Sequence, residues 1–294
     1  MRGTIERFQV SDGGSGPYGV AVGPDGGVWF TLVHAGEVGR LAADGSVRRF
    51  GPPAAESGPA VITAGPDGAL WFTRMRDHRI GRIDTDGRQR SFGLPTDAAG
   101  PFGIAAGPDG ALWFTELNAD RIGRITVDGR VTEYPLPMAG AFPSMITAGA
   151  DGALWFTLNQ TGAVGRITVE GEITLHPLPT EGAAPVGIAA GGDGALWFVE
   201  IGAGQVGRIT VDGRVTEYPL PDRAARPHAV AAAPDGRLWF TEWAGNRIGS
   251  LTPDGRYEGY QLPVPSAEPH GVAVGPDGVV YAALEVGEIV RLTP

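Results

Sequence analysis

A small set of polar side chains in this chain could do chemistry, and each of them interrupts an otherwise regular sequence pattern. Glu268 and His270 are separated by a single proline, and Glu285 follows downstream. His228 and Tyr18 complete the set. Carboxylates bind divalent cations, and neutral imidazole accepts protons near pH 7. These residue types could carry out metal-assisted acid–base chemistry if the fold brings them together.

The elements that must position these residues come from a repeat of 42 residues. Its most regular part reads Gly-Pro-Asp-Gly-Ala-Leu-Trp-Phe-Thr at residues 107–115, and near copies occur along the whole chain. The aspartates of the seven copies are Asp25, Asp67, Asp109, Asp151, Asp193, Asp235 and Asp277. A period of this length corresponds to one supersecondary unit. The sequence therefore predicts one closed repeat domain spanning residues 1–294.

Each repeat has the pattern of four short strands separated by turns. In the third copy we expect them at residues 103–106, 111–116, 121–126 and 130–136. The Gly-Pro-Asp-Gly and Val-Asp-Gly segments between them supply the positive φ and the Asp-Gly chemistry of hairpin turns. The sequence thus predicts an all-β fold, a seven-bladed β-propeller with four antiparallel strands per blade.

The two ends of the chain indicate how the ring closes. The last copy stops at Pro294 without a fourth strand, whereas residues 5–8 have the pattern of a fourth strand with no earlier strands. We expect residues 1–10 to supply the outer strand of the last blade, because this removes an open sheet edge.

Two aromatic columns predict packing rather than chemistry. The first, expected between blades, contains Trp29, Trp71, Trp113, Trp155, Trp197, Trp239 and, in the last copy, Tyr281. The second, in the outer strands, contains Phe8, Phe50, Phe92, Tyr134, His176, Tyr218 and Tyr260. His176 is therefore interpreted as structural.

Chemistry is expected where the repeats stop agreeing. Directly after the proline that opens each copy stand Tyr18, Ala60, Phe102, Ser144, Val186, His228 and His270. Eight positions after each aspartate stand Val33, Met75, Leu117, Asn159, Ile201, Trp243 and Glu285. The first two strands of a blade are antiparallel, so both columns should meet at one mouth of the central channel. Glu268, His270 and Glu285 should then converge from the last blade, with Tyr18 and His228 as neighbours.

Two carboxylates at one mouth repel each other unless something lies between them. A shared proton or a divalent cation would relieve the repulsion, and few oxygen ligands favour Mg²⁺ that keeps several waters. A pair of solvated rim glutamates is the alternative.

Several further polar and aromatic residues stand near these columns. Trp243 could form an aromatic wall for a large cyclic ligand or be a partly exposed loop residue. His34 and His78, in loops after the second strand, are expected to be solvent-exposed. Glu116, Glu200 and Glu242 recur one position before the Glu285 column, which indicates rim support and leaves substrate contact open.

Composition excludes several classes of chemistry and partner. The chain contains no Cys and no Lys, so thiolate sites, disulfides and Schiff bases are excluded. A net charge of -10 argues against nucleic acid. No apolar run is long enough for a membrane span, and no secretory signal opens the sequence. We expect a cytoplasmic monomer.

The chain resembles the virginiamycin B lyase family. Seven near copies of Pro-Asp-Gly-x-Leu-Trp-Phe-Thr, each followed by a segment similar to Ile-Gly-Arg-Ile, carry the resemblance over the whole chain together with Tyr18, His228, Glu268, His270 and Glu285. The resemblance implies an antibiotic-resistance enzyme that opens streptogramin B type cyclic depsipeptides by elimination at the threonyl ester, with Mg²⁺ and without water. It further implies that Glu268 and Glu285 hold Mg²⁺, that His270 is the general base, and that His228 and Tyr18 line the substrate site.

Two other functions remain as alternatives. One is a metal-dependent lactone hydrolase on the same scaffold, although no Ser-His-Asp arrangement, Walker loop or zinc-type histidine cluster is present. The other is a non-catalytic propeller that binds a protein partner at its rim.

Overall fold

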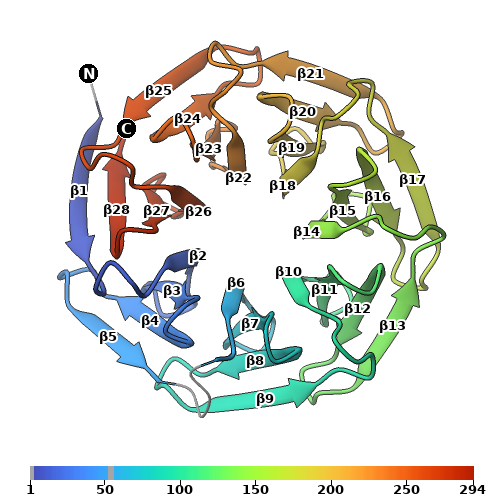
Figure 1. Cartoon of the computed structure of the whole chain (residues 1–294), viewed down its shortest axis with the longest axis horizontal. Helices are drawn as coiled ribbons and strands as arrows, with labels where there is room; N and C mark the ends of the chain where they lie inside the picture. Colours follow the sequence, from blue (N-terminus) through green and yellow to red (C-terminus); the bar gives the residue numbers. More distant parts are fainter. Residues whose placement is uncertain (1–2, 52–55) are drawn as a thin grey trace.

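The described part of the chain forms seven four-stranded antiparallel sheets, of which six are each built from one sequence repeat and the seventh combines the last repeat with the amino-terminal strand. The computed structural model describes residues 3–51 and 56–294. The sheets stand in a ring around a central axis, with the first strand of each repeat innermost (Figure 1). Within these described ranges no helix is long and apolar enough to cross a membrane. The predicted seven-bladed β-propeller is confirmed.

The blades are numbered here in chain order, with the strands of each given from the innermost to the outermost. Blade 1 contains β2 (Pro17–Val22), β3 (Val28–Leu32), β4 (Glu37–Leu41) and β5 (Val47–Phe50). Blade 2 contains β6 (Pro59–Ala64), β7 (Leu70–Arg74), β8 (Arg79–Ile83) and β9 (Gln89–Gly93). Blade 3 contains β10 (Pro101–Ala106), β11 (Leu112–Glu116), β12 (Arg121–Ile125) and β13 (Val131–Pro135). Blade 4 contains β14 (Pro143–Ala148), β15 (Leu154–Leu158), β16 (Ala163–Ile167) and β17 (Ile173–Pro177).

The remaining blades follow the same order. Blade 5 contains β18 (Pro185–Ala190), β19 (Leu196–Glu200), β20 (Gln205–Ile209) and β21 (Val215–Pro219). Blade 6 contains β22 (Pro227–Ala232), β23 (Leu238–Glu242), β24 (Arg247–Leu251) and β25 (Tyr257–Gln261). Blade 7 contains β26 (Pro269–Val274), β27 (Val280–Leu284), β28 (Glu288–Thr293) and β1 (Thr4–Gln9).

The strand at the amino terminus closes the ring as the sequence predicts. β1 pairs antiparallel with β28, so that Phe8 lies opposite Ile289. Arg7 donates to both carboxylate oxygens of Glu288, at 2.9 and 2.5 Å. Residues 1–2, the start of the predicted closing segment, lie outside the described residues.

The repeated Asp-Gly and Trp residues serve the blade itself. In blade 1, Asp25 accepts hydrogen bonds from Trp29 Nε1 (3.0 Å) and Arg40 Nε (2.6 Å). The same pair of bonds recurs at the aspartates of blades 2 to 5. The motif therefore stabilises the turn between the first two strands of a blade, and its role is structural.

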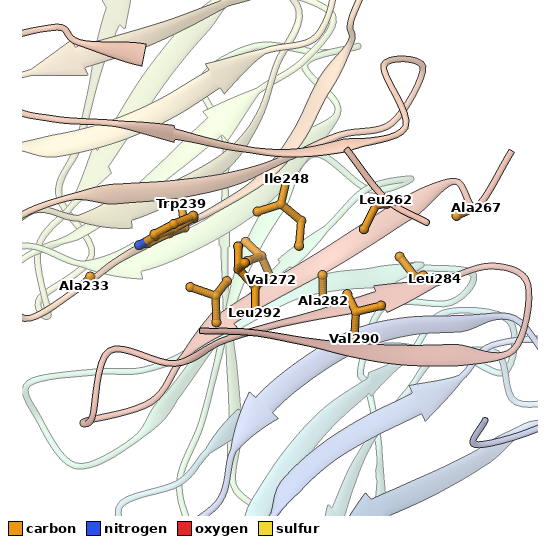
Figure 2. Close-up of a cluster of buried hydrophobic side chains, with 11 residues drawn as sticks. Ala233, Trp239, Ile248, Leu262, Ala267, Val272, Ala282, Leu284, Val290 and Leu292 are labelled. Atoms are coloured by element: carbon orange, nitrogen blue, oxygen red, sulfur yellow. The ribbon is translucent and has the colours of Figure 1, made fainter. Parts of the chain in front are cut away.

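The core lies between blades, where the tryptophan column was expected. Figure 2 shows Trp239 and Ile248 of blade 6 packed with Val272 and Val290 of blade 7. His176 stacks on Trp155 with ring centroids 5.4 Å apart, so its predicted structural role is confirmed.

Close backbone approach of blades 7 and 1 positions the site. A Cβ added to Gly271 would lie 2.5 Å from the Tyr18 carbonyl oxygen, so a larger residue there would force the blades apart. Glycine at this position brings His270 next to Tyr18.

Candidate functional site

Three aromatic side chains gather where the innermost strands begin. Tyr18, His228 and His270 each stand second in their strand, in β2, β22 and β26 respectively. The Tyr18 ring lies over the His270 ring with centroids 4.6 Å apart and an interplanar angle of 31°. The His228 ring meets the other two edge-on, at 5.9 Å from Tyr18 and 5.3 Å from His270. The column that follows the opening prolines therefore converges at one mouth, as the sequence predicts.

Glu268 and Glu285 come together through their backbones. Glu285 follows β27, and its backbone N–H donates to the carbonyl oxygens of Ala267 (3.0 Å) and Glu268 (3.3 Å). Glu268 has a φ of 46°, in the left-handed region where blades 1 to 3 use glycine. Blades 4 to 6 place Phe142, Ala184 and Arg226 at this position, also with positive φ. The conformation is therefore common to all the blades, and only the carboxylate is particular to blade 7.

The Glu285 carboxylate is held from both sides. Its Oε2 lies 3.1 Å from His270 Nε2, and its Oε1 lies 2.9 Å from His34 Nε2. The hydrogen bond from His270 lowers the pKa of Glu285, with His34 adding to the effect. Glu285 is therefore ionised at neutral pH.

Burial keeps Tyr18 and His228 uncharged. Burial raises the pKa of Tyr18, so its hydroxyl keeps its proton. Burial, together with the nearby His270, lowers the pKa of His228 to about 3. The Tyr18 hydroxyl lies 3.4 Å from His228 Nε2, a long and therefore weak contact to a neutral imidazole.

Arg76 and His34 join the site, although neither was a predicted site residue. Arg76 Nη2 lies 3.2 Å from His34 Nδ1. His34 is exposed as expected, yet its imidazole contacts Glu285 rather than only solvent. The available sequence signal is the column nine positions after each aspartate, which reads His34, Arg76, Asn118, Gln160, Gly202, Ala244 and Val286. Polar residues in this column are confined to blades 1 to 4.

An open cavity of about 530 Å³ lies at this mouth. Its lining includes Tyr18, His228, Glu268, His270 and Glu285. Trp243 also lines it, and the Arg226 guanidinium lies 5.8 Å from the Trp243 ring centre. All the predicted site residues therefore line one cavity.

The recurrent glutamates lie elsewhere. Glu116, Glu200 and Glu242 are buried in the blades and do not line the cavity at the mouth. Glu242 accepts from Arg247 Nε at 2.8 Å and from the Tyr257 hydroxyl at 2.6 Å. These residues support the blades, as the recurrence indicated.

His78 corrects one expectation. It is half-buried rather than solvent-exposed, and its Nδ1 accepts a hydrogen bond from the Gly100 backbone at 3.2 Å. This contact to the start of blade 3 explains why the side chain folds inward.

The donor set at the mouth fits Mg²⁺ but not a closed protein cage. Among residues 3–51 and 56–294 no group of three or more His, Cys, Asp or Glu side chains could hold a metal ion. Mg²⁺ needs only one or two carboxylates when waters fill the other positions. Each Glu285 oxygen accepts one imidazole contact and has a further lone pair available. Glu268 and Glu285 both line the cavity, so their carboxylates are the candidate ligands for such an ion.

Comparison with known proteins is consistent across sequence and structure. A model of the virginiamycin B lyase family matches residues 3–292. A solved streptogramin B lyase structure is 44% identical, covers 100% of this chain and 98% of its own, and superposes with a TM-score of 0.97. A catalytically inactive H270A virginiamycin B lyase from Staphylococcus aureus, solved with quinupristin, is 42% identical over 99% of each chain, with a TM-score of 0.96.

Curated relatives match over short segments. The virginiamycin B lyases of Saccharopolyspora erythraea and Streptomyces coelicolor are 57% and 59% identical over 41 residues. These segments span 14% of this chain and 14% of each relative.

Proposed function

The chain belongs to the virginiamycin B lyase family, and we propose that this lyase opens streptogramin B type cyclic depsipeptides by Mg²⁺-dependent elimination at the threonyl ester. One observation supports the proposal most strongly. His270 Nε2 lies 3.1 Å from an ionised Glu285 carboxylate, in a cavity large enough to receive part of a cyclic peptide. Loss of the ring would give resistance to the antibiotic.

His270 is the proposed general base. Its imidazole would take the Cα proton of the threonyl residue, because imidazole exchanges protons near neutral pH. The C–H electron pair would become the Cα–Cβ double bond, and the Cβ–O bond would break with its electrons on the leaving carboxylate. The linear product keeps every atom of the substrate, so no water is consumed.

Neighbouring side chains prepare His270 for this step. The Nε2–H of the imidazolium that forms would lie beside Glu285 Oε2, whose negative charge stabilises that cation. The Tyr18 ring, packed 4.6 Å from the His270 ring, holds the imidazole plane. The H270A relative named above is inactive, which supports the same role for His270 in this chain.

Tyr18, His228 and Trp243 are the proposed substrate contacts. All three line the cavity, and burial leaves the first two neutral. Neutral, partly apolar walls suit a large depsipeptide ring, and Trp243 offers an aromatic face.

Glu268 and Glu285 are the proposed Mg²⁺ ligands. When bound, the ion would act as a Lewis acid toward the carbonyl oxygen next to the reacting Cα. The remaining chemistry is assigned to His270. That the protein acts as a cytoplasmic monomer stays a prediction.

Metal removal tests the proposal. We expect the purified protein to open quinupristin with Mg²⁺ present, to stop in excess chelator, and to recover when Mg²⁺ is restored. Glu268→Gln should weaken Mg²⁺ binding in calorimetry by about 10-fold or more and slow ring opening, because one charged ligand is lost. Asp235→Asn, a mutation of an exposed carboxylate at a distant turn, serves as the control. Full activity in excess chelator would contradict the metal dependence.

A further inference from the structure

His34 and Arg76 have no role in the proposed chemistry, yet they extend the polar contacts of Glu285 into the next two blades. His34 follows β3 in blade 1, and Arg76 follows β7 in blade 2. Glu285 follows β27 in blade 7, and blade 1 stands between blade 7 and blade 2 in the ring (Figure 1). Arg76 Nη2 contacts His34 Nδ1 at 3.2 Å, and His34 Nε2 contacts Glu285 Oε1 at 2.9 Å. Three blades therefore meet in one chain of contacts.

The chemistry of the donors sets the direction of this chain. A guanidinium has N–H donors and no acceptor, so the contact from Arg76 requires a lone pair on His34 Nδ1. The proton of a neutral His34 ring must then sit on Nε2. From there it points at Glu285 Oε1, a carboxylate oxygen 2.9 Å away that accepts it.

Two donors on opposite oxygens fix a carboxylate that one donor would leave free to turn. Glu285 stands in the loop after β27, and its side chain is 27% exposed. A hydrogen bond from His270 alone would hold one carboxylate oxygen, and the carboxylate could still rotate about the Cγ–Cδ bond of Glu285. With His34 on Oε1, the oxygen that faces His270 is defined.

We propose that His34 and Arg76 are positioning residues for the elimination: Arg76 selects the Nε2–H form of His34, and His34 holds Glu285 in register with His270. The kinetic part of this inference rests on the proposed function. No other blade repeats the arrangement, because the equivalent positions after His34 and Arg76 are Asn118, Gln160, Gly202, Ala244 and Val286.

Kinetics separate positioning from direct substrate binding. His34→Ala should lower kcat about 10- to 100-fold, the range seen when a residue that orients a ligand or base is removed, with KM changed little. His34→Gln should recover much of kcat, since its amide N–H can reach the same oxygen. Gln160→Ala, at the same loop position of blade 4 and outside the cavity, should behave as wild type.

A double-mutant cycle tests the order of action. If Arg76 acts through His34, Arg76→Ala should lower kcat in the wild-type background and add nothing to His34→Ala. Additive losses, a change confined to KM, or unchanged kcat in His34→Ala would overturn the proposal.

Imidazole ¹⁵N chemical shifts of the substrate-free, metal-free protein provide a readout that does not depend on activity. We expect His34 to show a protonated Nε2 and an unprotonated Nδ1, and Arg76→Ala to shift the ring toward a mixture of both forms. If wild type opens no ring, the proposed function fails while the tautomer result still tests the Arg76 contact. An unchanged His34 spectrum in Arg76→Ala would overturn the assigned role of Arg76.

Discussion

The Glu285 carboxylate organises the site because it connects residues that lie far apart in the sequence. His270 and His34 reach it from different blades, and His34 is 251 positions away. Glu268, His270 and Glu285 could be predicted because each departs from its own repeat column. The role of His34 could not, since its contact depends on how the first blade meets the last one.

At this scale His270→Ala is the decisive substitution. We expect ring opening to fall below detection, because the change removes the imidazole nitrogen that lies 3.1 Å from Glu285 Oε2. The far-ultraviolet circular dichroism spectrum and Tm should stay near wild type, since His270 is partly exposed at the mouth. His176→Tyr is the matched control, because blades 3 and 5 carry tyrosine at this position. Turnover by His270→Ala at the wild-type rate would contradict the assignment of His270 as the general base.

Within single blades, the same column position is stabilised in different ways. Glu242 has an arginine and a tyrosine as partners, whereas neither carboxylate oxygen of the buried Glu116 has a hydrogen-bond partner among the described residues. Burial raises the pKa of Glu116 to about 8, with the charge of Glu133 adding to the shift. The repeat predicts where these glutamates sit but not their partners, because those come from non-repeated positions on neighbouring strands.

Glu116 predicts a pH-dependent stability. The unfolded chain loses this proton near the ordinary pKa of 4.5 and the folded chain near 8, so the free energy of unfolding falls as pH rises between these values. The glutamine in Glu116→Gln cannot ionise. The difference in free energy of unfolding between this variant and wild type, measured by urea unfolding, should therefore be more favourable to the variant by about 1 kcal/mol or more at pH 8 than at pH 5.

Glu242→Gln provides the comparison for that experiment. It should destabilise the protein at both pH values, because the Arg247 guanidinium loses the buried one of its two charged partners and keeps only Asp222. Equal pH slopes for wild type and Glu116→Gln would show that Glu116 is ionised in the folded protein.

For the whole molecule, the period of the repeat was sufficient to predict the ring and its closure. The strands of blade 3 begin and end close to the expected residues, except that β10 begins at Pro101, two residues before the predicted start. The proline was expected to precede the strand, yet it still pairs with Glu116 across a bulge. Strand ends depend on such local irregularities, which the repeat pattern does not encode.

Ring closure should be sensitive to the ion pair between β1 and β28. Arg7→Met leaves the buried Glu288 carboxylate without its partner and should lower Tm by several degrees in calorimetry. Glu6→Gln removes the exposed pair with Arg291 on the same two strands and should change Tm little. A smaller shift for Arg7→Met than for Glu6→Gln would argue against this role in closure.

The most direct test of the account is the mass of the reaction product formed from quinupristin in ¹⁸O-labelled water. Elimination predicts a linear product with the mass of the intact substrate and no ¹⁸O, formed by wild type and not by His270→Ala. A product heavier by one water, carrying ¹⁸O, would identify a hydrolase and contradict the proposed lyase reaction.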